Sequence, residues 1–329
     1  MTEHLLPPVR DWGEWGAIFT DAALWQPVVE RIAAAHGDRF PRPPHAVAAG
    51  FPGTCAVFTV RGPDAAEPPV VVKLFPPMVA GDFTRERAVY RLLDERLPEL
   101  PRLLADGVFR DRVAWPYLVF SFRPGAAWRD AAAGIPPEAR LGVGRALGGL
   151  LREVHYTPVM PGHGWPSVDS WKRFVVLQAA EAPVALRRRT ALREAVVAAA
   201  EALLRRTNFF AARPRLLHAD LTADHVLVSE RDGAWGISGL IDWADAEVGD
   251  PYYEWAALWF GFCGRDGGLL RAVLDGYGLV GGLDRERLLA FTLLHRFGPP
   301  MIADALSEDQ QRAVAGLDDL AALLLAGVE

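Results

Sequence analysis

The sequence predicts an α+β fold with two lobes, a small β-rich amino-terminal lobe with one main helix and a larger, mainly helical carboxy-terminal lobe. Between residues 55 and 122 the patterns follow the order strand, strand, helix, strand. After Gly125 the hydrophobic periodicity becomes mainly helical. We therefore assign the lobes to residues 1–122 and 123–329, and we expect one compact unit because no flexible linker marks the boundary.

The first lobe begins with a helical extension. The segment DAALWQPVVERIAAAHG ends at Gly37, a residue typical of helix carboxy termini, and prolines then interrupt the chain. Residues 55–60 and 70–75 are rich in β-branched and aromatic side chains and predict strands. A helix is predicted over residues 83–97 and a further strand over residues 117–122.

The second lobe is predicted to be built from helices. One of them has an apolar face that leads to His155, formed by Leu147, Leu150, Leu151 and Val154. Further helices are predicted over residues 181–206, 254–262, 285–297 and 310–326.

Composition excludes several classes of protein. The chain of 329 residues is 51% hydrophobic, enough for a substantial core, and its net charge of −6 argues against a general nucleic-acid binder. Cys55 and Cys263 are the two cysteines, which is too few for a disulfide framework. The sequence has neither a signal-peptide pattern nor an apolar stretch long enough for a membrane span. We expect a cytoplasmic protein with no nucleic-acid or membrane partner, either a monomer or a homodimer.

The segment from Leu216 to Trp255 carries the strongest functional pattern. H-A-D-L-T-A-D-H is followed by an apolar strand, a polar turn and L-I-D-W. A kinase catalytic loop has the pattern H-x-D-x-x-x-x-N, followed by two strands and an Asp that holds magnesium. The pattern therefore predicts phosphoryl transfer, with His225 in the place of the Asn.

Asp220 and Asp242 are the candidate acidic residues of this site. Asp220 is predicted to be the base for the acceptor hydroxyl, and His218 to brace its loop. The alternative for Asp220 is a solvated or helix-capping carboxylate. Asp242 follows an apolar run, where a carboxylate needs a cation such as magnesium or, alternatively, a structural salt bridge.

His225 leaves two alternatives open. Its imidazole nitrogen is either a metal ligand, which favours manganese over magnesium, or a hydrogen-bond partner of Asp220. Asp224 beside it offers a further oxygen ligand.

In the first lobe, Lys73 is predicted to contact nucleotide phosphates. A Lys within the apolar strand VVVKLF needs a partner, which Glu86 on the next helix supplies, unless it lies on an edge strand and reaches solvent. Gly50, Gly53 and Thr54, in the loop A-G-F-P-G-T, are candidates for phosphate binding through backbone amides.

These motifs resemble the aminoglycoside and choline-type phosphotransferase family, small-molecule kinases with a protein-kinase-like fold. The motifs, in family order from about residue 45 to residue 260, are V-V-V-K-L-F, R-E-R-A-V-Y-R-L-L, P-Y-L-V-F-S-F-R-P-G, L-L-R-E-V-H, H-A-D and L-I-D-W with G-D-P. Three segments, LWQPVVERIAAAHG, AWPYLVFSFRPGAAWR and LLAFTLLHRFG, are most similar to hygromycin-type phosphotransferases.

The resemblance implies a bilobal protein-kinase-like fold that uses ATP or GTP with Mg²⁺, or with Mn²⁺ if the imidazole is a ligand. It implies that Asp220 is the base, that Asp242 and His225 hold metal, and that Lys73 with Glu86 positions the phosphates. The chain departs from the family at His225, where Asn is expected, and at Ala219, where Gly is usual.

The leading hypothesis is transfer of the γ-phosphoryl group to a hydroxyl of a polar small molecule, including cationic aminocyclitols such as hygromycin B. A metabolic kinase acting on a sugar, an amino alcohol or a nucleoside is the second hypothesis, and a nucleotide-binding pseudokinase scaffold is the third. Five acidic residues could line a pocket for ammonium groups, or could equally be surface or capping carboxylates: Asp245, Glu247, Asp250, Glu254 and Asp266.

Overall fold

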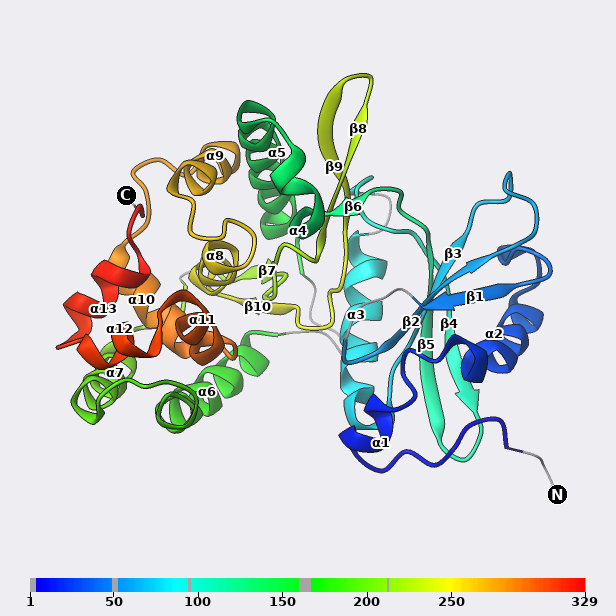
Figure 1. Cartoon of the computed structure of the whole chain (residues 1–329), viewed down its shortest axis with the longest axis horizontal. Coiled ribbons are helices and arrows are strands. Elements are labelled where there is room, and N and C mark those ends of the chain that lie inside the picture. The colour runs from blue at the N-terminus through cyan, green and yellow to red at the C-terminus, as the bar shows by residue number, and fades with distance from the viewer. Residues whose placement is uncertain (1–3, 49–52, 94–95, 160–166, 212, 329) are drawn as a thin grey trace. The chain divides into compact units, whose positions relative to one another are not determined.

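The structure is a computed structural model that describes residues 4–48, 53–93, 96–159, 167–211 and 213–328 (Figure 1). The chain forms two compact units. The first contains Met1–Pro124 with Asp242–Ala244, and the second contains Gly125–Ile241 with Asp245–Glu329. The predicted mixed α/β composition is confirmed, with a sheet in the amino-terminal part and mainly helices in the carboxy-terminal part.

The first unit is organised around an antiparallel five-stranded sheet of order β1-β2-β3-β5-β4. Its strands are β1 His45–Ala48, β2 Ala56–Arg61, β3 Val70–Leu74, β4 Leu103–Arg110 and β5 Ala114–Ser121. The predicted strands near β2, β3 and β5 are confirmed, and β1 and β4 are additional. Both additional strands lie at the edges of the sheet, where a weak sequence pattern suffices because only one neighbour must be paired.

Helices cover both faces of this sheet (Figure 1). α1 Trp12–Gly16 and α2 Ala22–His36 pack on the face that carries Phe58, Val72 and Trp115. α3 Ala80–Leu93 packs on the opposite face, where Tyr90 contacts Phe120 with ring centroids 4.5 Å apart. Short 3₁₀ turns follow α2 and precede α3, at Gly37–Arg39 and Pro77–Val79. Because side chains alternate along β3, Lys73 lies on the α3 face.

The second unit combines helices with two small sheets. The strands are β6 Ala126–Ala127, β8 Val226–Arg231 and β9 Ala234–Leu240 in one sheet, and β7 Arg215–Leu217 with β10 Glu247–Gly249 in the other. The helices are α4 Trp128–Ala131, α5 Pro137–Tyr156, α6 Val168–Arg189, α7 Glu194–Arg206, α8 Pro251–Phe260, α9 Gly267–Tyr277, α10 Arg285–Leu294, α11 Gly298–Ala305, α12 Glu308–Ala313 and α13 Leu317–Leu324.

α5 and α9 pack at very close range through glycines. A β-carbon at Gly148 would lie 1.9 Å from the carbonyl oxygen of Val273, and one at Gly276 would lie 2.0 Å from that of Arg145. The predicted apolar face of α5 is confirmed, because Leu147, Leu151 and Val154 are fully buried. Glycine at both crossing positions is therefore required by backbone contact between the helices.

The prediction of one continuous helix is wrong for two segments, because each segment forms two separate helices. The helix predicted over residues 181–206 is interrupted between α6 and α7, where Thr190 is extended and the amide of Ala191 donates to the side chain of Gln311 at 2.7 Å. The helix predicted over residues 310–326 is interrupted between α12 and α13, where Gly316 is fully extended. Tertiary contacts override helix propensity at the first break, and a glycine favours the second.

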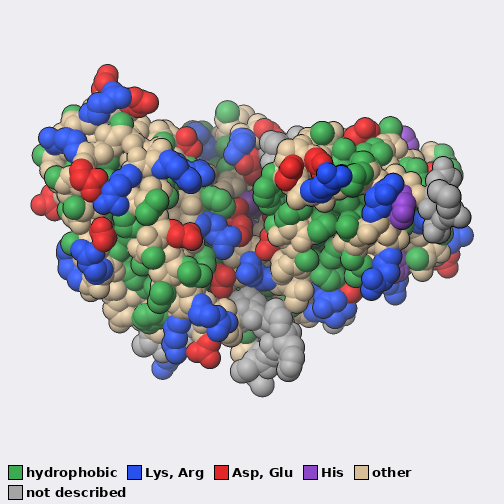
Figure 2. All heavy atoms as spheres, turned by 90° about the horizontal axis from the view of Figure 1, so that it is seen from below, with side chains coloured by type: hydrophobic (Ala, Val, Ile, Leu, Met, Phe, Trp, Pro, Cys, Tyr) green, Lys and Arg blue, Asp and Glu red, His purple; other side chains and the backbone are tan. Residues whose placement is uncertain are grey.

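Charged side chains are interspersed on the face of the molecule drawn in Figure 2, where basic and acidic groups alternate with apolar ones. Three large apolar side chains of α6, Val176, Leu177 and Val184, are at least 60% exposed. In the described part of the chain, no helix is both long and apolar enough to cross a membrane.

Candidate active site

The first unit buries a lysine between two carboxylates. Lys73 lies in β3, the central strand of the sheet, and its Nζ is 2.7 Å from Glu86 Oε2 and 2.8 Å from Asp242 Oδ1. Lys73 is 6% exposed and Glu86 is 1% exposed, which excludes the alternative of an edge-strand Lys that reaches solvent. The structure thus brings together three of the predicted site residues.

The charges of this cluster depend on one another. Burial alone would lower the pKa of Lys73, but Asp242 and Glu86 together raise it well above its ordinary value, so the ammonium stays charged. Burial raises the pKa of Glu86 to about 7 against the opposing attraction of Lys73. Asp242 differs from Glu86 because its side chain is 42% exposed. Of these two carboxylates, Asp242 is therefore the one that is accessible to a further cation.

The second unit contains the loop that carries Asp220, between β7 and β8. The His218 ring is fully buried, and its Nε2 donates to the carbonyl of Ile241 at 2.9 Å. Asp220 itself is only partly buried, with 19% of its side chain exposed. The loop therefore holds one histidine inside the protein as a brace and leaves a carboxylate accessible.

Ala219 fixes the shape of this loop through an uncommon backbone conformation. Its φ is 66°, in the left-handed region that favours glycine. The amides of His218 and Ala219 donate to the carboxylate of Glu254, at 2.6 Å and 3.3 Å, and the carbonyl of Ala219 accepts from His295 Nε2 at 3.2 Å. Both backbone groups of the strained residue are therefore held by buried side chains from α8 and from the end of α10.

The roles of Glu254 and His295 were not predicted from the sequence. Glu254 is fully buried, and His155 Nε2 lies 3.6 Å from its Oε2. One signal could have identified it: a lone carboxylate within the apolar helix sequence PYYEWAALWF must be paired. His295 carried no comparable signal, because its partner is a backbone carbonyl 76 residues away.

The burial of His295 predicts that the stability of the folded protein depends on pH. Burial lowers the pKa of His295 from 6.5 to about 3, and the neighbouring Arg296 adds to this shift. The imidazole binds a proton near pH 6.5 in the unfolded chain but only near pH 3 in the folded protein. Protonation of this ring therefore has no effect on the free energy of unfolding above pH 6.5 and lowers it as the pH falls from 6.5 toward 3. Its slope is at most ~1.4 kcal/mol per pH unit. Urea unfolding between pH 7 and pH 5 should show a shallower pH dependence for His295→Gln than for wild type.

The control for this prediction is His45→Gln, which changes an exposed histidine on β1. If His295→Gln and wild type lose stability in parallel as the pH falls, His295 is not the group responsible.

His225 contacts the backbone of Asp220, which was predicted as its hydrogen-bond partner in the alternative to metal binding. Its Nδ1 donates to the carbonyl oxygen of Asp220 at 2.6 Å and lies 3.8 Å from Asp220 Oδ2. The hydrogen-bonded alternative for His225 is therefore present in the structure. With the proton on Nδ1, the neutral ring carries its lone pair on Nε2, the nitrogen through which it could still bind metal.

The acidic residues that follow Asp242 are committed to contacts within the protein. Asp245 pairs with Arg296, and Asp250 caps α8 and pairs with Arg287. Asp266 caps α9 through the amide of Leu269, and Glu247 is buried. The structure therefore favours the structural alternative for most of this set over a pocket for ammonium groups.

The glycine-containing loop is described only in part. Gly50 lies outside the described residues, whereas Gly53 and Thr54 precede β2. The carbonyl of Thr54 accepts a hydrogen bond from the indole of Trp15 at 3.0 Å.

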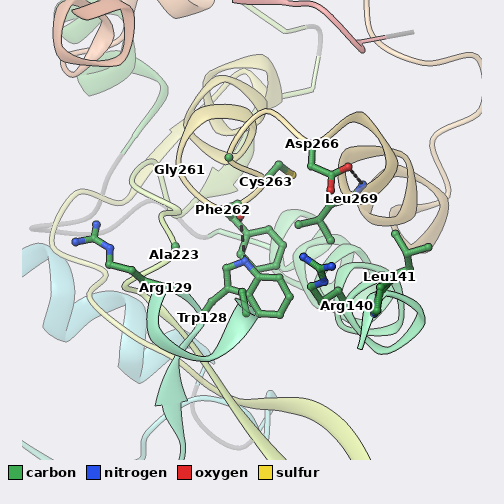
Figure 3. Close-up of a pocket in the computed structure, with 13 residues that line it drawn as sticks. Trp128, Arg129, Arg140, Leu141, Ala223, Gly261, Phe262, Cys263, Asp266 and Leu269 are labelled. Atoms are coloured by element: carbon green, nitrogen blue, oxygen red, sulfur yellow. Dashed lines mark hydrogen bonds between the residues drawn. The ribbon is translucent and has the colours of Figure 1, made fainter. Parts of the chain in front are cut away.

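A pocket of about 340 Å³ lies beside the loop that carries Asp220 in the second unit (Figure 3). Its wall contains the stacked rings of Trp128 and Phe262, 4.9 Å apart, and the guanidinium of Arg140. Ala223 of the loop borders it, and the neighbouring Asp224 pairs with Arg129. The carboxylate of Asp224, a candidate metal ligand from the sequence, is thus engaged in an ion pair with Arg129.

The residues present fit a metal ion that is bound together with a nucleotide. Within the described residues, no group of three or more His, Cys, Asp or Glu side chains is arranged to hold a metal. Magnesium in kinase-type sites is held by one or two carboxylates plus substrate phosphates, and a partly exposed carboxylate such as that of Asp242 suits this arrangement.

Comparison with known proteins identifies the class of this protein. Residues 56–291 match the phosphotransferase enzyme family, and the chain belongs to this family. The protein is a small-molecule phosphotransferase, as the sequence analysis predicted.

Solved structures with the same fold are aminoglycoside phosphotransferases. A thermostable mutant of APH(4)-Ia in its apo form is 20% identical, with a TM-score of 0.56, and the match covers 85% of this chain and 91% of that chain. APH(2")-IIia in complex with GDP and kanamycin is 19% identical, with a TM-score of 0.61 and coverage of 91% and 97%. Spectinomycin phosphotransferase APH(9)-Ia with ADP and spectinomycin is 14% identical, with a TM-score of 0.57 and coverage of 92% and 98%.

Proposed function

We propose that this protein transfers the γ-phosphoryl group of ATP or GTP to a hydroxyl of an aminoglycoside or aminocyclitol, with a hygromycin-like compound as the favoured acceptor. The two compact units act as the lobes of a bilobal, protein-kinase-like enzyme. The observation that carries the proposal is the buried Lys73 between Glu86 and Asp242. A charged ammonium fixed in a central strand suits binding of nucleotide phosphates, because its position is set by two carboxylates.

In the proposed reaction, the site residues act on the acceptor hydroxyl, on the nucleotide phosphates or on the metal ion. Asp220 accepts the proton of the acceptor hydroxyl, and its loop is held by His218, Glu254 and His295. Lys73 orients the α- and β-phosphates, and Asp242, with His225 as a second ligand, would hold magnesium. A metal ion bound there would neutralise charge on the nucleotide phosphates.

A metabolic small-molecule kinase is the second candidate function. It is favoured by one observation: Asp245, Asp250 and Asp266 are engaged in ion pairs or helix caps, so they do not form a ready site for a polycationic acceptor. A neutral acceptor such as a sugar or nucleoside would need no such carboxylates.

Transfer of radiolabelled γ-phosphate tests the proposal. We expect purified protein to label an aminoglycoside or aminocyclitol from ATP or GTP with Mg²⁺ or Mn²⁺. Sugars, amino alcohols and nucleosides are screened in parallel, and a product among these alone would support the second candidate. Nucleotide binding without transfer to any acceptor would identify a pseudokinase instead.

His225→Asn is expected to change the metal preference. If Nε2 of His225 binds the metal, wild type should turn over at least as fast with Mn²⁺ as with Mg²⁺, because nitrogen ligands suit Mn²⁺ better. An Asn carbonyl oxygen should shift the ratio of the two rates toward Mg²⁺. The ratio of kcat with each metal is the measurement, and an unchanged ratio with a lower kcat would show that the imidazole acts only through Asp220.

A further inference from the structure

We infer that Trp15 is a positioning residue for the nucleotide, because its indole N–H holds the backbone of Thr54, just before β2 begins. This inference rests on the proposed role of Lys73 in orienting the nucleotide phosphates. Trp15 lies in α1, outside the segment that matches the family, and it is 2% exposed. Its Nε1 donates to the carbonyl of Thr54 at 3.0 Å.

The indole is itself held in place. Asp11 caps α1 by accepting from the amides of Gly13 and Glu14, each at 2.9 Å. The Trp15 ring stacks on Trp115 of β5 with centroids 5.7 Å apart and meets the edge of Trp25 of α2 at 5.9 Å. The donor is thus fixed by the sheet and by both helices of the extension, so it presents the N–H in one direction.

The hydrogen bond lies a short distance along the chain from the lysine. Thr54 is two residues before Ala56, where β2 begins. In the register of β2 with β3, Ala56 is opposite Leu74 and Val57 is opposite Lys73. The position of Thr54 therefore sets where Gly53 and the start of β2 lie relative to Lys73. Loss of the N–H should reduce nucleotide binding without changing the residues that perform the chemistry.

The tryptophan cluster offers two matched controls. Trp25 Nε1 donates to the carbonyl of Ile18 at 2.8 Å, a bond that stays within the amino-terminal extension. Trp115 Nε1 is buried and has no hydrogen-bond partner in the described part of the chain. Replacing each Trp with Phe removes one indole from the same cluster, but the bond to the Thr54 carbonyl is lost at Trp15 alone.

The experiment compares Trp15→Phe, Trp25→Phe and Trp115→Phe. We expect Trp15→Phe to raise the nucleotide KM and the calorimetric Kd by roughly 3- to 10-fold, the size expected for loss of one buried hydrogen bond. The acceptor KM and kcat should stay at wild-type values. The other two variants should keep the wild-type nucleotide KM even where their thermal stability falls.

If the Trp15→Phe variant does not fold, β-(3-benzothienyl)alanine can be incorporated at position 15 instead. This amino acid lacks the N–H but keeps the bicyclic shape of the indole, so it tests the hydrogen bond alone. Wild-type nucleotide KM in this protein, or an equal rise in Trp15→Phe and Trp25→Phe, would overturn the inference while leaving the proposed function intact. Absence of nucleotide binding by wild type would overturn both.

Discussion

Asp220→Asn should lower kcat by ~10² to 10⁴-fold, the usual contribution of a general base, while the nucleotide Kd changes only a few fold. The carboxylate acts on the acceptor hydroxyl, so its loss affects the chemical step and not the binding of the nucleotide. The substitution is also conservative in shape, which leaves His225 free to keep its hydrogen bond to the carbonyl of residue 220. Single-turnover rates at saturating acceptor, with calorimetry of the nucleotide, measure the two effects separately.

Asp232→Asn is the matched control for this variant. Asp232 is exposed at the turn between β8 and β9, with φ of 52°, a conformation that Asn adopts readily. The Asp232→Asn variant should have wild-type kinetics. If Asp220→Asn retains more than half of the wild-type turnover, Asp220 is not the base.

Removal of the Asp242 carboxylate should have the second large effect. Turnover should fall at least ~10²-fold, because metal stabilisation of transition-state charge is worth several kcal/mol and each ~1.4 kcal/mol changes a rate tenfold. The affinity for magnesium-nucleotide should fall as well. Affinity for the nucleotide in EDTA should change less, since only the metal-dependent part of binding is lost.

Two variants at this position separate metal binding from backbone strain. Asp242 has φ of 64°, so Asp242→Ala adds left-handed strain that Asp242→Asn avoids. Both should lose magnesium-dependent binding, and the Asn variant should do so with the smaller change in thermal stability. Unchanged magnesium-nucleotide affinity together with normal turnover in Asp242→Asn would contradict the kinase-type assignment of this site.

The elements predicted from sequence were those with strong local patterns. β2, β3 and β5 carry β-branched or aromatic runs, and α5 shows a clear apolar periodicity, so each is recognisable without knowledge of its neighbours. Glu86 was predicted as the partner of Lys73, because a buried ammonium must be paired, and the structure places Glu86 beside it. The contact of Lys73 with Asp242 was not predicted, because Asp242 was assigned to a metal ion or to a salt bridge with no named partner.

What sequence could not show depends on contacts between distant residues. The bond from His295 to Ala219 and the bond from Trp15 to Thr54 each join a side chain to a backbone carbonyl, and backbone acceptors leave no trace in residue identity. The break between α6 and α7 depends on Gln311, more than a hundred residues later. The roles of Asp245 and Asp250 were ambiguous for the same reason, since their basic partners, Arg296 and Arg287, lie 51 and 37 residues later in the chain.

The bond from His295 to Ala219 also makes the chain suitable for division into a split enzyme. A cut at Val280, which is 96% exposed between α9 and α10, would leave Asp220 on one fragment and His295 on the other. The fragment with the loop that carries Asp220 would lack the donor that holds the Ala219 carbonyl, so neither fragment would contain both partners of this bond. Activity recovered when two fused partner proteins bring the fragments together would then report that association.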